Sequence, residues 1–189
     1  MQARPIATTV AIIALGAVPL AAQTHHSTHG QPGHHGRPSA AQPYAGLESR
    51  PVKALSEEQI LDLRAGRGMR LALAAELNGY PGPMHVLELA EHLGLSPEQR
   101  SRTQTLFEQM KEEAILIGNR LISEETALDR LFAERNITAE ALASATARIG
   151  AAQAELRAVH LRYHLTMVEV LSPQQVARYN ESRGYGRAG

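Results

Sequence analysis

Two stretches in the second half of the chain place apolar side chains at alternating spacings of three and four residues. In the first stretch, over 97–134, seven of the eight positions in this register are apolar. The eight positions are Phe107, Met110, Ala114, Ile117, Leu121, Glu124, Leu128 and Leu131. The second stretch, over 139–171, repeats through Leu142, Ala145, Ile149, Ala152, Leu156, Val159 and Tyr163. This spacing is typical of amphipathic helices packed along their length, and the short link between the stretches predicts an antiparallel helical hairpin.

Nearly the same pentapeptide stands at the start of two predicted helices: LSPEQ at 95–99 and LSPQQ at 171–175. In both, the serine is a good N-cap, the proline suits the first helical position, and the glutamine occupies the third position of a capping box. The residues assigned to the two motifs are Leu95, Ser96, Pro97 and Gln99, and Leu171, Ser172, Pro173 and Gln175. Each pentapeptide therefore predicts a bend at which one helix ends and the next begins.

The remaining elements are also predicted to be helical, which makes the fold class all-α. A looser copy of the motif, LSEEQ at 55–59, predicts a helix over 56–77, and the turn-forming NGYPGP ends it. A short helix over 84–93 and a terminal helix over 173–183 follow. The predicted organisation is a leader at 1–22, an arm at 23–54, an N-terminal helix and turn at 55–83, a helical domain at 84–184 and a frayed tail at 185–189.

Composition narrows the function classes. The 19 basic and 19 acidic side chains balance, which argues against the basic field that non-specific nucleic-acid binding requires. The absence of cysteine excludes disulfides, thiolate zinc sites and a cysteine nucleophile. The sequence contains no glycine-rich phosphate loop and no His-Glu-x-x-His run, so we expect no enzyme. Because the hairpin seam is narrow and rich in alanine, we expect a homodimer to complete its burial.

The first 22 residues are expected to direct export. Arg4 is the only charge before a short apolar run that ends in Ala21 and Ala22, which is the pattern of a cleaved signal peptide. The alternative is a retained membrane anchor, but the apolar run is shorter than the roughly 20 residues that a spanning helix needs. We therefore expect cleavage near Ala22 and a periplasmic location.

The arm that follows carries a dense group of histidines in a His-, Gly- and Pro-rich stretch that is typical of disorder. These residues are His25, His26, His29, His34 and His35. Clustered imidazoles bind Cu(II), Ni(II) or Zn(II), so one interpretation is weak metal capture. The other is a soluble spacer that happens to use histidine.

A second candidate metal site lies on the predicted helix over 139–171. His160 and His164 are four residues apart, so their rings project from one helical face, and Met167 lies on the same side. The hairpin is expected to bring His92 into this neighbourhood. The alternative is that the two histidines are structural residues on the flank of the helix.

The paired Leu-Ser-x-x-Gln motifs, the hairpin between them and the export signal together resemble the Spy/CpxP family of periplasmic proteins, which has the metal-linked relatives ZraP and CnrX. The resemblance covers about 84–183, with serine in place of the family's more usual threonine in both motifs. It implies an intertwined, cradle-shaped dimer of bent helices. It also implies ATP-independent chaperoning of unfolded periplasmic clients, and the CpxP branch implies a membrane sensor-kinase or sigma-regulator partner.

The segment over 56–83 lies outside the part of the chain that carries this resemblance. Within it, Arg64, Arg67 and Arg70 recur every three residues beside leucines, either as a client-binding surface or as the solvated face of a packed helix. The first functional hypothesis is a chaperone that needs no cofactor and binds unfolded clients. The alternative is a heavy-metal sensor or buffer that uses its histidines for Cu, Ni, Co or Zn.

Overall fold

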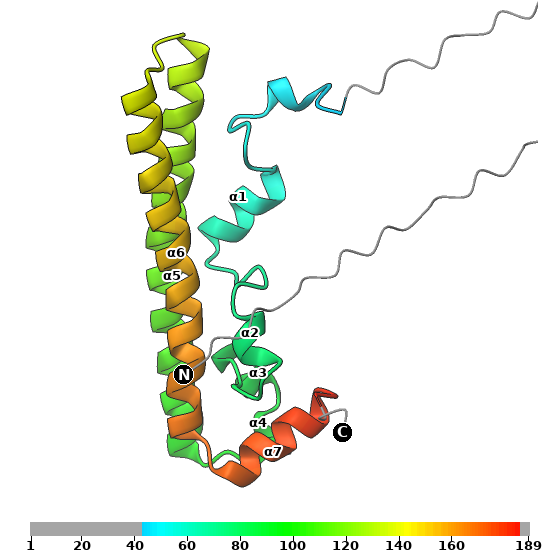
Figure 1. The fold of residues 1–189 in the computed structure, drawn as a ribbon. Coiled ribbons are helices and arrows are strands. Elements are labelled where there is room, and N and C mark those ends of the chain that lie inside the picture. Colours follow the sequence, from blue (N-terminus) through cyan, green and yellow to red (C-terminus); the bar gives the residue numbers. More distant parts are fainter. Residues whose placement is uncertain (1–42, 186–189) are drawn as a thin grey trace, which may run out of the picture. The chain divides into compact units, whose positions relative to one another are not determined.

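The computed structural model describes residues 43–185, and within this range every regular element is a helix (Figure 1). The all-α fold class is therefore confirmed. In chain order the elements are η1 (Leu47–Ser49), α1 (Glu57–Arg64), α2 (Leu73–Glu76), α3 (Pro83–Glu88), α4 (Ala90–Leu93), α5 (Pro97–Ala133), α6 (Ala139–Val170) and α7 (Pro173–Ser182). The predicted signal segment, most of the predicted arm with its five histidines, and the last four residues lie outside the described range.

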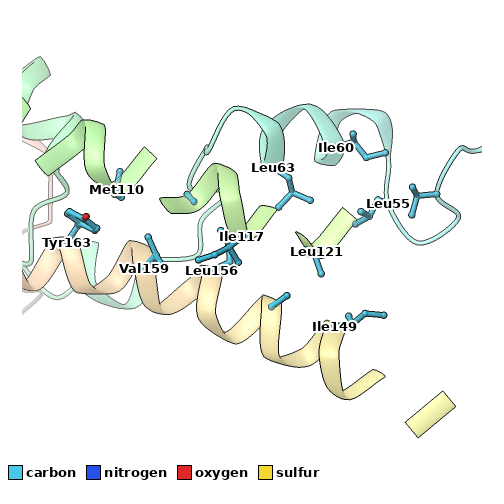
Figure 2. Packing of buried hydrophobic residues seen from close by; sticks show 13 residues of the cluster. Leu55, Ile60, Leu63, Met110, Ile117, Leu121, Ile149, Leu156, Val159 and Tyr163 are labelled. Carbon is cyan, nitrogen blue, oxygen red and sulfur yellow. The ribbon is translucent and has the colours of Figure 1, made fainter. Parts of the chain in front are cut away.

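The long helices α5 and α6 pack side by side as the predicted antiparallel hairpin (Figure 1). Figure 2 shows the apolar cluster between them, to which Met110, Ile117 and Leu121 of α5 and Leu156 and Val159 of α6 contribute. The seam weakens toward the connecting loop, where side chains such as Leu142 of α6 are exposed. The charged seam position Glu124 pairs with Arg148 of α6, Nε to Oε2, at 2.8 Å.

The helix starts are capped as the sequence predicts. The Ser96 hydroxyl accepts a hydrogen bond from the backbone N–H of Gln99, and the Ser172 hydroxyl accepts one from the backbone N–H of Gln175. In each case the glutamine side chain also accepts from the backbone N–H of the serine, which completes the capping box. The structure also shows a contact that the sequence pattern does not reveal: the two pentapeptides touch each other through their glutamines. Gln99 Nε2 donates to Gln175 Oε1, and Gln175 Nε2 donates to Gln99 Oε1, both at 2.9 Å. The two pentapeptides therefore join the start of α5 to the start of α7.

The prediction of one continuous helix over 56–77 is wrong, because the chain leaves the helical conformation in the middle of this range. Helix α1 ends at Arg64, and the chain turns before α2 begins at Leu73. The turn contains three residues with left-handed backbones: Gly66 at φ +66°, Met69 at +41° and Arg70 at +66°. A helix cannot continue through such conformations. Similarly, the short helix predicted over 84–93 is divided at Leu89 into α3 and α4.

Helix α1 packs on α5 at a very close approach. Ile60 and Leu63 of α1 enter the cluster of the hairpin. Gly118 of α5 is buried, and a Cβ atom placed there would lie 2.6 Å from the Leu63 carbonyl oxygen. Glycine at this position therefore permits the contact. A second apolar cluster lies where α3, α4, α6 and α7 meet, and Val86, Leu93, Met167, Val170, Leu171 and Tyr179 form it.

Among residues 43–185, no helix is both long enough and apolar enough to cross a bilayer.

Replacing Gly118 by alanine should separate α1 from α5, because the added methyl group overlaps the Leu63 backbone. We expect the free energy of unfolding to fall by about 1–3 kcal/mol, as for other overpacked cores. Gly150 in α6 is the matched control, because a Cβ atom there meets nothing within 4 Å. Alanine at Gly150 should raise stability by about 0.5–1 kcal/mol through helix propensity. Urea unfolding curves measure both, and equal effects at the two glycines would contradict the close packing of α1.

Candidate functional site

A cavity of about 680 Å³ opens between the 62–76 segment, α3, α5 and α6. Most of its wall is apolar, but several side chains in it can bind ions. Three imidazoles line it, those of His85, His160 and His164. Two carboxylates, Asp62 and Glu76, and three thioethers, Met69, Met84 and Met110, also line it. This combination makes the cavity the strongest candidate for a functional site within residues 43–185.

Glu76 is the buried acid of the cavity, with 5% of its surface exposed. Its Oε1 accepts hydrogen bonds from the Tyr179 hydroxyl of α7 and from His85 Nδ1 of α3, the latter at 3.2 Å. Arg183 Nε lies 3.8 Å from the same oxygen. Burial alone would raise the pKa of Glu76, but the hydrogen bonds from His85 and Tyr179 and the charges of the nearby histidines lower the pKa overall. Glu76 is therefore an ionised carboxylate that connects α2, α3 and the C-terminal segment.

The Tyr179 hydroxyl is a donor that does not ionise. Burial is the largest cause that raises the pKa of Tyr179, and the adjacent Glu76 carboxylate raises it further. The proton thus stays on the hydroxyl and points at Glu76. Because Tyr179 is fully buried, water cannot take its place as donor.

His164 of α6 is held in a defined orientation. Its Nδ1 lies 2.7 Å from the Tyr80 carbonyl oxygen, and since that oxygen can only accept, Nδ1 carries the hydrogen. When the ring is neutral, the Nε2 atom carries the lone pair, as in histidines that bind metals. A Cβ atom at Gly82 would lie 2.9 Å from this Nε2. The glycine in the NGYPGP turn therefore leaves room for the imidazole.

His160, one turn earlier on α6, is 2% exposed, and its Nε2 has no hydrogen-bond partner among residues 43–185. Burial first, and then the neighbouring His164, lowers the pKa of His160, so the ring is neutral near pH 7. Glu76 Oε2 is also buried and without a hydrogen-bond partner in the described part of the chain. Buried polar atoms are rarely left unpaired, and among the described residues only Asn180 Oδ1 shares this status with these two atoms.

The structure places the candidate residues of the sequence analysis in different surroundings. His160 and His164 both face the cavity. Met167 does not line it, and packs instead in the apolar cluster beside Val86 and Tyr179. His92 is exposed on α4 and also lies outside the cavity wall. Arg64, Arg67 and Arg70 are exposed, and Arg67 Nε pairs with Asp62 Oδ1 at 2.5 Å.

Sequence reasoning missed Glu76, His85 and the three cavity methionines. Glu76 and His85 stand on either side of the NGYPGP turn, which brings them into contact. A turn rich in glycine and proline between an acid and a histidine is the one signal that indicates this contact. In the range that the structure describes, no three His, Cys, Asp or Glu side chains are already arranged to hold a metal ion. Nitrogen and carboxylate donors are thus present around the cavity without forming a complete ligand set.

A family model described as heavy-metal resistance matches residues 71–178, more than half of the chain. The matched range contains Glu76, His85, His160 and His164. Curated proteins and solved structures give no match.

Replacing Tyr179 by phenylalanine should destabilise the protein, because it removes a buried donor to the Glu76 carboxylate. We expect a loss of about 1–3 kcal/mol in the free energy of unfolding. Tyr163 is the matched control, because its hydroxyl also donates to a glutamate, Glu113, whose side chain is accessible to water. The same substitution at Tyr163 should cost clearly less. Thermal and urea unfolding measure both variants, and equal losses would contradict a special role for the Glu76 network.

Proposed function

The chain belongs to the heavy-metal resistance family, and we propose that it binds a transition metal ion in the cavity beside His160 and His164. This family includes the Spy/CpxP-like and the CnrX/ZraP-like proteins, so the resemblance noted in the sequence extends over most of the described helices. Heavy-metal resistance or sensing is accordingly the general function. The ion is one of the class formed by Cu, Ni, Co and Zn.

The observation that carries the proposal is that four groups line one cavity. Two of them are buried atoms without a hydrogen-bond partner, and two are histidines that hydrogen bonds hold in place. His160 Nε2 and Glu76 Oε2 lack partners, and His164 Nε2 is left free by the hydrogen bond of Nδ1 to Tyr80. His85 is held in the same way by Glu76, Nδ1 to Oε1. These are the residues that would hold the ion, with carbonyl and carboxylate partners behind the imidazoles as metal sites require. Since the donors do not yet form a closed set, side-chain rotation within the cavity accompanies binding.

The same carboxylate provides a route by which the cavity can influence the rest of the protein. Glu76 lines the cavity, and its Oε2 is buried without a hydrogen-bond partner in the described residues, whereas Oε1 receives the Tyr179 hydroxyl of α7. An ion held at Oε2 would draw negative charge toward that oxygen. Because the two carboxylate oxygens share one negative charge, Oε1 would then be a weaker hydrogen-bond acceptor for the Tyr179 hydroxyl. The attachment of α7 therefore responds to what the cavity holds, which suits a sensor as well as a buffer.

Metal binding by the full chain tests this proposal. The five arm histidines are first replaced by glutamine, so that only the helical part contributes. Replacing His160 and His164 together by glutamine in that background should weaken binding by about 10–100-fold, because two donors are lost. The control is His92 to glutamine, which removes an exposed imidazole outside the cavity. Titration calorimetry with Zn(II), Ni(II) and Cu(II) measures affinity, and an unchanged affinity in the double variant would overturn the cavity site.

Chaperoning of unfolded proteins is the second function that we propose, because apolar and basic side chains share the surface. Leu116 of α5 is 71% exposed, and Leu61, Leu77, Phe132 and Leu165 are also largely exposed. Arg64, Arg67 and Arg70 are exposed on and after α1. Mixed apolar and basic surfaces adapt to many unfolded chains, and this binding requires neither ATP nor a cofactor. We further propose that the protein is exported to the periplasm, has no catalytic activity and forms a homodimer that covers part of this apolar surface.

Light scattering of an aggregating client measures the second function. The protein should suppress aggregation without ATP, and replacing Leu116 and Leu165 together by glutamate should weaken the suppression at least severalfold, because two exposed apolar contacts are lost. Replacing the exposed Glu112 and Glu169 by glutamine changes surface charge on the same two helices and is the control. The assay is run with and without Cu(II), Ni(II) and Zn(II). No suppression under any of these conditions would exclude the chaperone function and leave the metal function as the proposal.

A further inference from the structure

We propose that the cavity between the 62–76 segment, α3, α5 and α6 binds a single-chain organic acid, which is an apolar molecule that carries one carboxylate. The apolar body lies inside the cavity, and Arg70 and Lys111 supply the positive charge for the carboxylate at its opening. This inference goes beyond the proposed metal binding and requires no metal ion. Three observations carry it: the size of the cavity, the charge of its lining and the burial of its charged and apolar members.

The cavity has the size of a ligand site and exceeds that of a packing defect. Well-packed interiors leave few voids larger than a water molecule, whereas cavities that bind small organic molecules enclose roughly 300–1,000 Å³. At about 680 Å³, this cavity falls in the second range. Most of its wall is apolar, with Leu73, Phe107 and Met110 among the residues that form it. A hydrocarbon chain therefore gains free energy by leaving water for this cavity.

The lining carries a surplus of positive charge, because four cationic side chains and two carboxylates belong to it. Both carboxylates already have a cationic neighbour. Arg67 Nε lies 2.5 Å from Asp62 Oδ1, and Arg183 Nε lies 3.8 Å from Glu76 Oε1. Two cations of the lining are therefore left over.

The two remaining cations are Arg70 and Lys111, and neither forms an ion pair within residues 43–185. Both residues are exposed, so they belong to the part of the lining that meets solvent. Arginine and lysine form charge-assisted hydrogen bonds with carboxylates, and arginine can form two parallel ones. A carboxylate at the opening of the cavity can therefore pair with a cation that no acid of the described chain engages.

The buried part of the lining favours a hydrocarbon chain over a second acid. Glu76 is buried and ionised there, and its Oε1 accepts hydrogen bonds from Tyr179 and His85. A ligand carboxylate beside Glu76 would be repelled and would lose its hydration. The buried apolar members of the lining, Pro83 and Met110, place no such penalty on a hydrocarbon. The ligand therefore binds with its apolar body inward and its acid outward.

The histidine-rich arm of the same chain is the alternative occupant, but its chemistry does not match the cavity. Residues 23–42 contain no Leu, Ile, Val, Met, Phe, Tyr or Trp, and their only Lys, Arg, Asp or Glu is Arg37. Such a segment offers no large apolar side chain to the wall and adds positive charge to a lining that already has a surplus. A separate acidic ligand fits the cavity on both counts.

Decanoate is the probe that tests the inference, used below the concentration at which it forms micelles. The full chain is first dialysed free of metal ions. Decanol and decylamine have the same chain with a neutral and a cationic head, respectively. Titration calorimetry should show one decanoate site per chain, with an affinity at least about tenfold above that for decanol or decylamine, because only the acid forms a charge-assisted hydrogen bond. Added NaCl should weaken the binding of decanoate and leave that of decanol unchanged.

Replacing Arg70 and Lys111 together by glutamine should abolish the preference for decanoate over decanol and leave the decanol affinity unchanged. Both residues are exposed, so we expect the variant to fold, and circular dichroism verifies this. The matched control is Arg64→Gln/Arg157→Gln, which removes two exposed cations that lie outside the lining. This control should keep the full preference for decanoate.

A second control separates the cavity from the exposed apolar surface. Leu116→Gln/Leu165→Gln removes two exposed apolar side chains outside the lining and should bind decanoate as the parent does. Loss of binding in this control, absence of decanoate binding to the parent, or an unchanged preference in the Arg70 and Lys111 variant would overturn the inference. Metal titration of the double histidine variant tests the proposed function separately. Metal binding without decanoate binding would leave only the proposed function standing, and the reverse result would leave only this inference.

Discussion

The buried carboxylate of Glu76 is the constraint on which the arrangement around the cavity depends. It lies on the short α2 helix and accepts hydrogen bonds from His85 of α3 and Tyr179 of α7. Arg183 and His164 lie within 4 Å of its two oxygens. A buried charge is costly unless it is surrounded by donors, so the elements that supply these donors must stay together around it. The positions of His85 and His164 follow from this requirement.

The pairing of Gln99 with Gln175 plays a corresponding role at the helix starts. Each carboxamide oxygen accepts from its own N-cap backbone and from the other glutamine. Each nitrogen donates to the other glutamine and to a backbone carbonyl, that of Val170 at 2.9 Å and that of Gly94 at 3.4 Å. Both amides thus use all of their hydrogen-bonding capacity. A motif that is locally a helix cap is, in the folded protein, also a contact between two distant helices.

Local patterns explain why the hairpin, the caps and the pair His160 and His164 could be predicted. Helical period, capping boxes and the spacing of four residues act within one element, so they are visible in sequence alone. The turn at 65–72 could not be predicted in this way, because its left-handed residues include Met69 and Arg70, which have ordinary helical preferences. In this turn Gly66 approaches α5 closely, because a Cβ atom there would lie 2.7 Å from the Lys111 carbonyl oxygen, and no local pattern reveals such a tertiary contact. Likewise, Met167 shares the helical face of His164, yet tertiary packing assigns it to the other apolar cluster.

The hairpin that underlies both proposed functions packs unevenly along its length. The cavity lies along the part of α5 and α6 that contains Met110 and His160, where α2 and α3 also contact the hairpin. Toward the loop between α5 and α6, buried side chains become sparse, and Phe132 and Leu142 are exposed. A fixed ligand set requires the first kind of surroundings, because its donors must be held by packing. Binding of varied unfolded chains requires the second kind, in which apolar contacts are available and adaptable. The same helical pair thus contains both kinds of surroundings.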